Sequence, residues 1–263
     1  MATTTTKSVA LLFGLNYKSV PGSQLNGCIN DIRNTAVFLK DTLKFAEVNQ
    51  FDDEVHFDQC TALGIVSNLN KLGLRSWAEN LDLVWIHYSG HGTYIRDSNG
   101  DERDGRDECL CPVDYTKSGF IRDDDIAVLL SRFNPRTKVI FIADCCHSGT
   151  IGDLKFRWVD RSRKISENTR VVCNSPVTMI SGCMDKQTSA DAWLADPSGQ
   201  MQAQGALTNA LLRVLKEDTK TCCGNVFVLV DRTRAVLKNG GFTQYPELTS
   251  SYDLSLNPMV VPF

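Results

Sequence analysis

The sequence predicts an α/β sandwich, in which helices cover both faces of a mostly parallel central sheet. Apolar, β-rich runs bounded by polar residues recur along the chain, and stretches with the helical spacing of apolar residues lie between them. Strands that alternate with helices pair in parallel through right-handed crossovers. The 263 residues, 42% of them hydrophobic and 22% charged, can bury a sizeable core and exclude a disordered or collagen-like chain.

Strands and helices are expected in chain order from these two patterns. Four short apolar runs read as buried strands: Val9–Tyr17, Leu81–Tyr88, Lys138–Cys145 and Val171–Ser181. Four longer stretches carry apolar residues on one helical face: Asp31–Phe45, Thr61–Asn80, Asp123–Phe133 and Gly205–Glu217. The first helix, for example, aligns Ile32, Ala36 and Leu39.

Two charged segments depart from this alternation. The acidic segment Asp97–Glu108 has the composition of a loop. The basic segment, residues 154–170, holds six Lys or Arg residues and is expected to be an exposed hinge. We therefore divide the chain into a large part (residues 1–153), this hinge and a small part (residues 171–263), which together form one domain.

The balance of charges and the length of the apolar runs argue against a nucleic-acid-binding or membrane-spanning protein. With 28 basic against 31 acidic residues, the chain offers no electrostatic footprint for nucleic acid. No apolar stretch reaches the roughly 18 to 20 residues that span a membrane, and the run Val9–Leu15 lacks a signal-peptide cleavage site. Ten cysteines, including two adjacent pairs, suit a reducing compartment. A soluble protein of the cytoplasm, or of the nucleus, is expected.

A cysteine and a histidine follow two of the predicted strands. Chemistry in such sheets gathers at the carboxyl ends of strands, where His91 and Cys146 stand. A cysteine thiol needs a nearby base to become a nucleophile, and nearby glycines leave backbone N–H groups available to hold an oxyanion. Taken singly, His91 could equally be a turn residue and Cys146 a buried small residue.

The flanks of both residues carry a family resemblance. The stretches His87–Gly92 (HYSGHG) and Asp144–Gly149 (DCCHSG) resemble the paired signatures of the metacaspases, which are calcium-responsive cysteine peptidases with a caspase-like, three-layer fold. Further motifs resemble the same family, and they extend the resemblance over nearly the whole chain: Gly27–Asp31, Asp107–Glu108, Pro112–Asp114, Ile180–Cys183 and Gln187–Asp191. The chain looks like a compact type I core without an N-terminal prodomain.

The resemblance implies a catalytic dyad. Cys146 matches the nucleophile and His91 the base that removes its proton, without an orienting carboxylate as third member. The backbone N–H groups of Gly92 and Cys146 would hold the oxyanion. Many relatives have serine where Cys145 stands, so this cysteine is a spare thiol, a redox modulator or merely a small residue.

The resemblance also implies a specificity pocket. Positions that line the primary pocket in metacaspases match Cys28, Asp31, Ser89 and Asp144. Two carboxylates suit the guanidinium of Arg or the ammonium of Lys and repel an acidic side chain. Asp31 could instead cap the helix that it precedes, and both roles are compatible.

Acidic residues suggest a calcium site, since Ca²⁺ takes six to eight oxygen ligands. By resemblance, the site falls on Asp107, Asp123, Asp124 and Asp153. Asp97, Asn99, Asp101 and Glu108 also match an EF-hand spacing, but Glu102 occupies its glycine position. The run Asp123–Asp125 could equally be the acidic first turn of a helix. The remaining cysteines lack the spacing of a zinc site.

The function predicted is that of a calcium-dependent cysteine endopeptidase. It would cleave protein or peptide substrates after Arg or Lys, act as a monomer and process itself in the basic segment. The alternatives are an inactive caspase-like scaffold that binds partners or calcium, and a thiol redox protein that uses Cys145 and Cys146.

Overall fold

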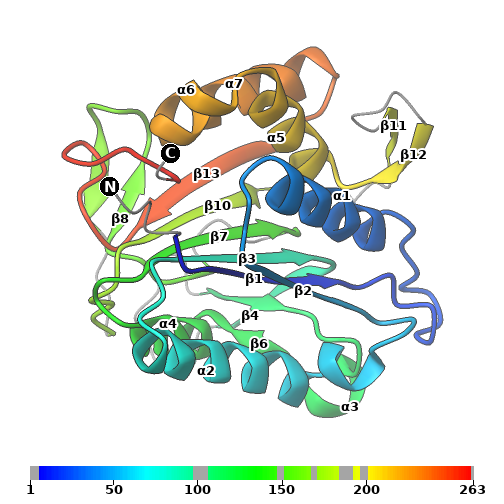
Figure 1. Cartoon of the computed structure of the whole chain (residues 1–263). Coiled ribbons are helices and arrows are strands. Elements are labelled where there is room, and N and C mark those ends of the chain that lie inside the picture. Colours follow the sequence, from blue (N-terminus) through cyan, green and yellow to red (C-terminus); the bar gives the residue numbers. More distant parts are fainter. Residues whose placement is uncertain are drawn as a thin grey trace.

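The central feature of the computed structural model is an eight-stranded sheet of order β2-β1-β3-β7-β10-β13-β8-β9 (Figure 1). The structure describes residues 6–96, 106–146, 151–166, 171–183, 192–195 and 201–261. Neighbours from β2 to β10 run parallel, and β13, β8 and β9 pair in antiparallel fashion. The strands are β1 (Ser8–Gly14), β2 (Glu47–Asp52), β3 (Leu83–Ser89), β7 (Lys138–Asp144), β10 (Val177–Cys183), β13 (Tyr245–Ser250), β8 (Phe156–Trp158) and β9 (Lys164–Ser166).

Helices cover both faces of this sheet, which confirms the predicted fold class (Figure 1). One face carries α1 (Cys28–Asp41), α5 (Ala206–Glu217), α6 (Thr219–Gly224) and α7 (Val226–Asn239). The other carries α2 (Ala62–Ala78), α4 (Asp123–Ser131) and a small sheet of β4 (Gly92–Arg96), β5 (Arg106–Leu110) and β6 (Ile121–Arg122). The remaining elements are η1 (Phe57–Cys60), α3 (Tyr115–Ser118), β11 (Ala192–Ala195) and β12 (Met201–Gln204).

Strand alternation divides the core into two layers. Successive side chains of a strand point to opposite faces, so Val84, Ile86 and Tyr88 of β3 join the layer beneath α2 and α4. Leu83 and Trp85 of the same strand join the layer beneath α1, α5 and α7. In β7, Ile140 and Ile142 lie in this second layer, so Asp144, two residues further on, belongs on the same side. The alternation therefore decides which polar residues at the strand ends face α1 and α5.

The eight expected elements are all present, with boundaries displaced by a few residues. The last strand shows the largest change, since β10 begins at Val177 rather than at Val171. Strands β2 and β13, the small sheet and α7 were not expected from the sequence. Strand β2, EVNQFD, is half-buried at the sheet edge and has no apolar run to reveal it.

The basic segment differs from the weakly structured hinge that its composition predicts. Its described residues, 154–166, form the antiparallel hairpin of β8 and β9, and β8 pairs with β13 in the main sheet. Trp158 anchors the hairpin, because its indole is buried, donates to Ser250 Oγ at 2.7 Å and lies 5.3 Å from the Phe227 ring. The alternation of aromatic and charged residues in FRW explains the strand, which the count of basic residues obscured.

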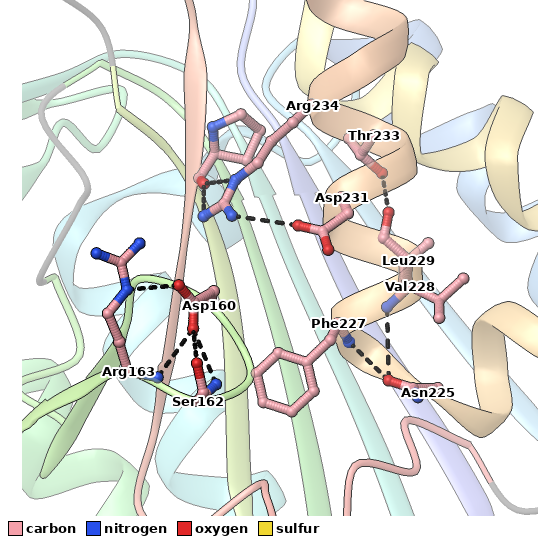
Figure 2. Close-up of polar contacts among 11 residues, drawn as sticks. Asp160, Ser162, Arg163, Asn225, Phe227, Val228, Leu229, Asp231, Thr233 and Arg234 are labelled. Atoms are coloured by element: carbon pink, nitrogen blue, oxygen red, sulfur yellow. Dashed lines mark hydrogen bonds and ion pairs between the residues drawn. The ribbon is translucent and has the colours of Figure 1, made fainter.

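A compact turn closes this hairpin (Figure 2). The carboxylate of Asp160 accepts hydrogen bonds from Ser162 N and Oγ, at 2.9 and 2.7 Å, and from Arg163 N and Nε, at 2.9 and 2.6 Å. Aspartate favours such turns because its short side chain can satisfy nearby backbone N–H groups. The side chains of Arg161 and Arg163 remain exposed at the tip.

Helix α7 packs on β13 on the face of the sheet that also carries α1 and α5, and its polar contacts are drawn in Figure 2. The side chain of Asn225 caps it by accepting from the backbone N–H groups of Phe227 and Val228. The guanidinium of Arg234 donates to the Pro246 carbonyl of β13, at 3.0 and 2.8 Å. Helix α7 and β13 are thus joined by polar as well as apolar contacts.

Two further predictions concern the cysteines and the membrane. No disulfide joins any of the nine cysteines whose side chains are described. Within the described ranges, every helix is too short or too polar to cross a lipid bilayer.

Candidate active site

The segments of His91 and Cys146 meet at the carboxyl ends of two neighbouring strands. Strands β3 and β7 pair in parallel so that Ser89 lies opposite Asp144, and Gly90 N donates to the Asp144 carbonyl at 3.3 Å. A Cβ atom on Gly92 would lie only 2.0 Å from the Cys146 carbonyl oxygen and 3.1 Å from Cys145 Sγ. Only glycine permits this approach. The structure therefore brings the predicted base, the predicted nucleophile and both predicted oxyanion donors together.

A backbone carbonyl orients the His91 ring. Its Nε2–H donates to the Ser23 carbonyl oxygen at 2.8 Å, because a carbonyl can only accept. In the neutral imidazole, the other nitrogen, Nδ1, then carries the lone pair that can accept a proton. The Tyr17 ring packs against the imidazole, with centroids 4.7 Å apart. Sequence reasoning proposed no orienting group, because a backbone carbonyl carries no sequence signal.

Tyr17 organises the backbone around His91. Its buried hydroxyl donates to the Cys111 carbonyl at 2.6 Å, accepts from His91 N at 2.9 Å and lies 2.9 Å from the Tyr88 hydroxyl. Its φ of 54° is in the left-handed region, which is unfavourable for a bulky residue. The carboxylate of Asp53 holds the turn by accepting from Asn16 N at 2.8 Å and Tyr17 N at 2.6 Å. Sequence reasoning did not single out either residue.

The adjacent cysteines occupy different environments. Cys145 continues the alternation of Phe141 and Ala143 into the core layer beneath α2 and α4, where it is 2% exposed. Cys146 stands one residue later, past the end of β7, and is 9% exposed. Of the three roles considered for Cys145, this burial supports that of a small core residue. Residues 147–150, which include His147, lie outside the described residues.

The carboxylate of Asp31 binds groups outside its own helix. Helix α1 begins with Gly27 as its N-cap, so the prediction that Asp31 caps this helix is wrong. Its fully buried carboxylate accepts instead from Ser89 Oγ at 2.6 Å and from Gly205 N at 2.9 and 3.0 Å. Helix α1 starts three residues earlier than the amphipathic pattern indicated, so Asp31 lies within its first turn rather than before it. Asp31 thereby satisfies the first N–H group of α5.

The carboxylate of Asp144 also contacts α5. Its Oδ2 accepts from Thr208 N at 2.8 Å and from Thr208 Oγ1 at 2.7 Å, within the first turn of α5. Burial raises the pKa of Asp144, and hydrogen bonds from Thr208 and the Gln244 side chain oppose that rise. The positive end of the helix favours both carboxylates in their ionised form.

The carboxylates of Asp31 and Asp144 both lie against Gly205. A Cβ atom on Gly205 would lie 2.3 Å from Asp144 Oδ2 and 2.7 Å from Asp31 Oδ2. Ser89 and Cys28, the other two predicted pocket residues, are also buried, at 1% and 5% exposure. Three of the four predicted pocket residues are thus joined by contacts to one another or to Gly205, and Cys28 lies three residues before Asp31 in α1. No sequence motif indicates that Gly205 and Thr208 belong to this pocket.

The predicted calcium residues surround the start of α4. Asp123 begins this helix and is buried, and its carboxylate accepts from Glu108 N at 2.7 Å and Asp124 N at 2.9 Å. Burial, together with the charges of Asp153 and Asp107, raises the pKa of Asp123 to about 7. Asp107 of β5 is buried, and its Oδ2 lies 3.9 Å from Arg122 Nη1. Asp123–Asp125 do form the acidic first turn of α4, as the alternative proposed.

The acidic residues are electrostatic neighbours rather than a formed ligand set. Among the described residues, no three His, Cys, Asp or Glu side chains are gathered as a metal site. The donor chemistry of the four predicted carboxylates suits a hard cation. Of the EF-hand match, Asp97, Asn99 and Asp101 lie outside the described residues, and Glu108 belongs to β5.

Comparisons with known proteins agree with this architecture. A family model described as "Metacaspase, peptidase C14 domain" matches residues 8–155. Metacaspase-2 of Trypanosoma brucei brucei is 36% identical over 266 residues, which span 94% of this chain and 74% of the relative. Metacaspase-1B of Aspergillus terreus is 31% identical over 305 residues, which span 96% of this chain and 77% of the relative.

A solved structure supports the fold alone. The crystal structure of a Geobacter sulfurreducens protein superimposes with a TM-score of 0.65 and 23% sequence identity, covering 97% of this chain and 100% of that one. The family model covers more than half of the chain, and the relatives cover nearly all of it. The chain therefore belongs to the metacaspase family of cysteine endopeptidases.

Proposed function

We propose that this metacaspase cleaves peptide bonds after Arg or Lys by means of a Cys146–His91 dyad, and that calcium activates it. The observation that supports the proposal most is the contact of Gly92 with Cys146, at the point where β3 and β7 end beside two buried carboxylates. The proposed nucleophile, base and cation-binding carboxylates then all lie at one edge of the sheet. Since one chain supplies all of them, we also propose that the enzyme acts as a monomer.

The proposed reaction proceeds through an acyl-enzyme. His91 Nδ1 accepts the thiol proton of Cys146, and the thiolate attacks the carbonyl carbon of the scissile bond. The N–H groups of Gly92 and Cys146 stabilise the oxyanion. His91 then returns the proton to the leaving amine, and water hydrolyses the thioester with His91 again as base. Ser23 keeps the imidazole in the required tautomer throughout. Such a thiol needs reducing surroundings, so we place the enzyme in the cytoplasm or nucleus.

The basic preference follows from the two carboxylates behind the pocket. Asp31 and Asp144 are already hydrogen-bonded to Ser89, Gly205 and Thr208, which holds their remaining lone pairs in fixed directions. A guanidinium or ammonium group that reaches them gains charge-assisted hydrogen bonds, whereas an aspartate side chain meets repulsion. Cys28 and Ser89 complete the proposed pocket.

The proposed calcium site holds Asp107, Asp123, Asp124 and Asp153. The proposal is supported by the burial of the Asp107 and Asp123 carboxylates and by the raised pKa of Asp123, which follows from that burial and from the charges of Asp153 and Asp107. A bound cation would supply the missing positive charge and draw these acidic groups, from β5, α4 and the segment after the nucleophile, into one arrangement. The family resemblance supplies the metal's identity.

Self-processing in the basic segment completes the proposal. Arg161 and Arg163 are exposed at the tip of the β8–β9 hairpin and offer the side chains that the pocket would accept. Asp153, which belongs to the proposed calcium site, lies three residues before β8. Binding of calcium could therefore release the hairpin for cleavage.

One experiment tests the function and the metal together. Purified protein is assayed against short peptide substrates that differ only in Arg, Lys or Asp before the scissile bond, with millimolar calcium or excess chelator. We expect cleavage after Arg and Lys that requires calcium, is absent in Cys146→Ala and survives in Cys145→Ser. The Asp123→Ala, Asp124→Ala double variant should lose the calcium response, whereas Asp125→Ala, in the same helical turn but exposed, should keep it.

Each part of the proposal can fail separately. Activity in Cys146→Ala with loss in Cys145→Ser would reverse the nucleophile assignment. Efficient cleavage after aspartate would contradict the pocket, and full activity in excess chelator would contradict calcium activation.

A further inference from the structure

His87 is a buried histidine of the HYSGHG motif that the proposed reaction does not use. It is 1% exposed, and burial lowers its pKa to about 3, so it is neutral at physiological pH. It lies on β3 two residues before Ser89, on the face of the sheet that α1 and α5 cover. A buried polar side chain in such a place normally satisfies a partner.

The partners of His87 belong to two helices. Its Nε2 lies 3.1 Å from Thr208 Oγ1 of α5, and its Nδ1 lies 3.4 Å from Thr35 Oγ1 of α1. Both threonines are fully buried. Figure 1 shows α1 and α5 side by side above β3 and β7, which is why one imidazole can contact both helices.

The direction of each hydrogen bond can be derived. Thr208 Oγ1 has one proton, and it donates this proton to Asp144 Oδ2 at 2.7 Å. The same oxygen must therefore accept from His87, so Nε2 of His87 carries the hydrogen. In the neutral ring Nδ1 is then an acceptor, and Thr35 Oγ1–H donates to it. A continuous chain, Thr35 to His87 to Thr208 to Asp144, ends on the specificity carboxylate.

We propose that His87 is a specificity-determining positioning residue, which acts through Thr208 to hold the Asp144 carboxylate in the orientation that binds a basic side chain. The inference rests on the proposed preference for Arg and Lys and adds the device that maintains it. If His87 did not donate to it, the Thr208 hydroxyl could rotate and donate elsewhere, and Asp144 would lose one of its charge-assisted hydrogen bonds. His87 itself touches neither substrate nor nucleophile.

Two pairs of variants separate the loss of a hydrogen-bonding group from the loss of side-chain volume. His87→Met and Thr208→Val keep the approximate volume and remove the polar group, whereas His87→Gln and Thr208→Ser keep a donor or hydroxyl. We expect KM for an Arg peptide to rise about tenfold in the first two, with kcat changed less than about twofold, because a hydrogen bond to a charged group is lost. His87→Gln and Thr208→Ser should recover most of that loss. Thr233→Val, which removes another fully buried threonine hydroxyl in α7, serves as the matched control.

The double variant tests whether His87 acts through Thr208. Once Thr208 is valine, His87→Met should raise KM no further, so the two effects should not add. Additive effects, an unchanged KM in both single variants, or equal losses in His87→Gln and His87→Met would overturn the proposal. If His87→Met does not fold, the tautomer of the His87 ring decides, together with KM in His87→Gln.

A spectroscopic measurement distinguishes failure of this inference from failure of the proposed specificity. Long-range ¹H–¹⁵N spectra of histidine-labelled Cys146→Ala protein report the tautomer of each ring. We expect the Nε2–H tautomer for His87, assigned by its absence in His87→Gln, and the Nδ1–H tautomer would overturn the hydrogen-bonded chain. If wild type shows no basic preference, the proposed function fails even where this tautomer is found.

Discussion

The imidazole of His91 is held by an uncharged backbone carbonyl, that of Ser23, at 2.8 Å. A carboxylate in this place would stabilise the imidazolium, whereas a carbonyl mainly selects the tautomer. A thiol is far more acidic than a hydroxyl and forms a strong nucleophile without a strongly basic partner. At the scale of single residues, orientation is therefore the main contribution that the surroundings of His91 make.

Asp144 and Asp31 allow a direct test of the pocket. Replacing either by Asn keeps the shape and one acceptor oxygen but removes the negative charge. A bound guanidinium would then be left without its partner, so we expect kcat/KM for Arg peptides to fall about 100-fold or more. Asp231→Asn, on the exposed surface of α7, is the control and should have no effect. A loss below about threefold in both pocket variants would contradict the assignment.

His87 also makes a prediction about stability. Its folded pKa of about 3 lies below the ordinary value of 6.5, so the unfolded chain binds more protons between these values. The free energy of unfolding should therefore rise with pH across this window, with a contribution of up to about 1.4 kcal/mol per pH unit, and level off above it. His87→Gln should lack this contribution. Urea titrations at pH 4.5 and 6.5 measure it, and equal pH slopes for the two proteins would contradict it.

At the scale of elements, the sequence predicts most where burial is complete. The strands β1, β3 and β7 are mostly apolar and buried along nearly their whole length, and their patterns locate them to within a few residues. Edge strands such as β2 and β9 have one side in solvent, so polar residues interrupt their pattern and hide them. Charged residues likewise interrupt the apolar pattern of β8 and β9, so the sequence does not predict their hairpin.

The candidate site likewise contains residues that the sequence predicts and residues that only the folded structure reveals. His91, Cys146, Asp31 and Asp144 belong to short motifs, which a single stretch of sequence can reveal. Thr208 acquires its role from contacts with Asp144 and His87, 64 and 121 residues away. Such pairings depend on helix α5 docking onto the sheet, which no local pattern records. Gly205 likewise matters only because two distant carboxylates lie against it.

The Asp160 turn should control self-processing. A peptide bond must be extended to enter a protease cleft, and this turn holds the residues around Arg161 in a closed conformation. We therefore expect Asp160→Ala to accelerate calcium-triggered cleavage between Phe156 and Val171. Asp218→Ala, which removes a comparable half-buried cap on α6, should cleave at the wild-type rate. Intact-mass analysis over time measures both rates, and Cys146→Ala should remain uncut. Cleavage that persists in Cys146→Ala, or an active wild type that stays intact, would contradict self-processing.

At the scale of the whole molecule, the strands of the two parts are interleaved. Strands β10 and β13, which follow the proposed cut, lie between β7 and β8, which precede it. The two fragments would thus share hydrogen bonds on both sides of this strand pair, as well as the contacts of α5 with Asp31 and Asp144. Cleavage removes a covalent connection without exposing either core layer.

We therefore expect the cleaved enzyme to remain one particle. In size-exclusion chromatography under native conditions, both fragments should elute together at the volume of the intact chain and retain activity. In denaturing urea they should separate into a large fragment of about 155 to 170 residues and a small one, as expected from a cut in an exposed tip. Separate elution of active fragments without denaturant would show that the interleaved strands do not hold them.

The contacts of α5 with Asp31 and Asp144 also have a consequence during synthesis. The ribosome synthesises His91 and Cys146 before it synthesises α5. Gly205 and Thr208, which fix Asp31 and Asp144, emerge much later. Until then the growing polypeptide lacks the contacts that hold Asp31 and Asp144, so we expect the proposed recognition site to form only after α5 has been made.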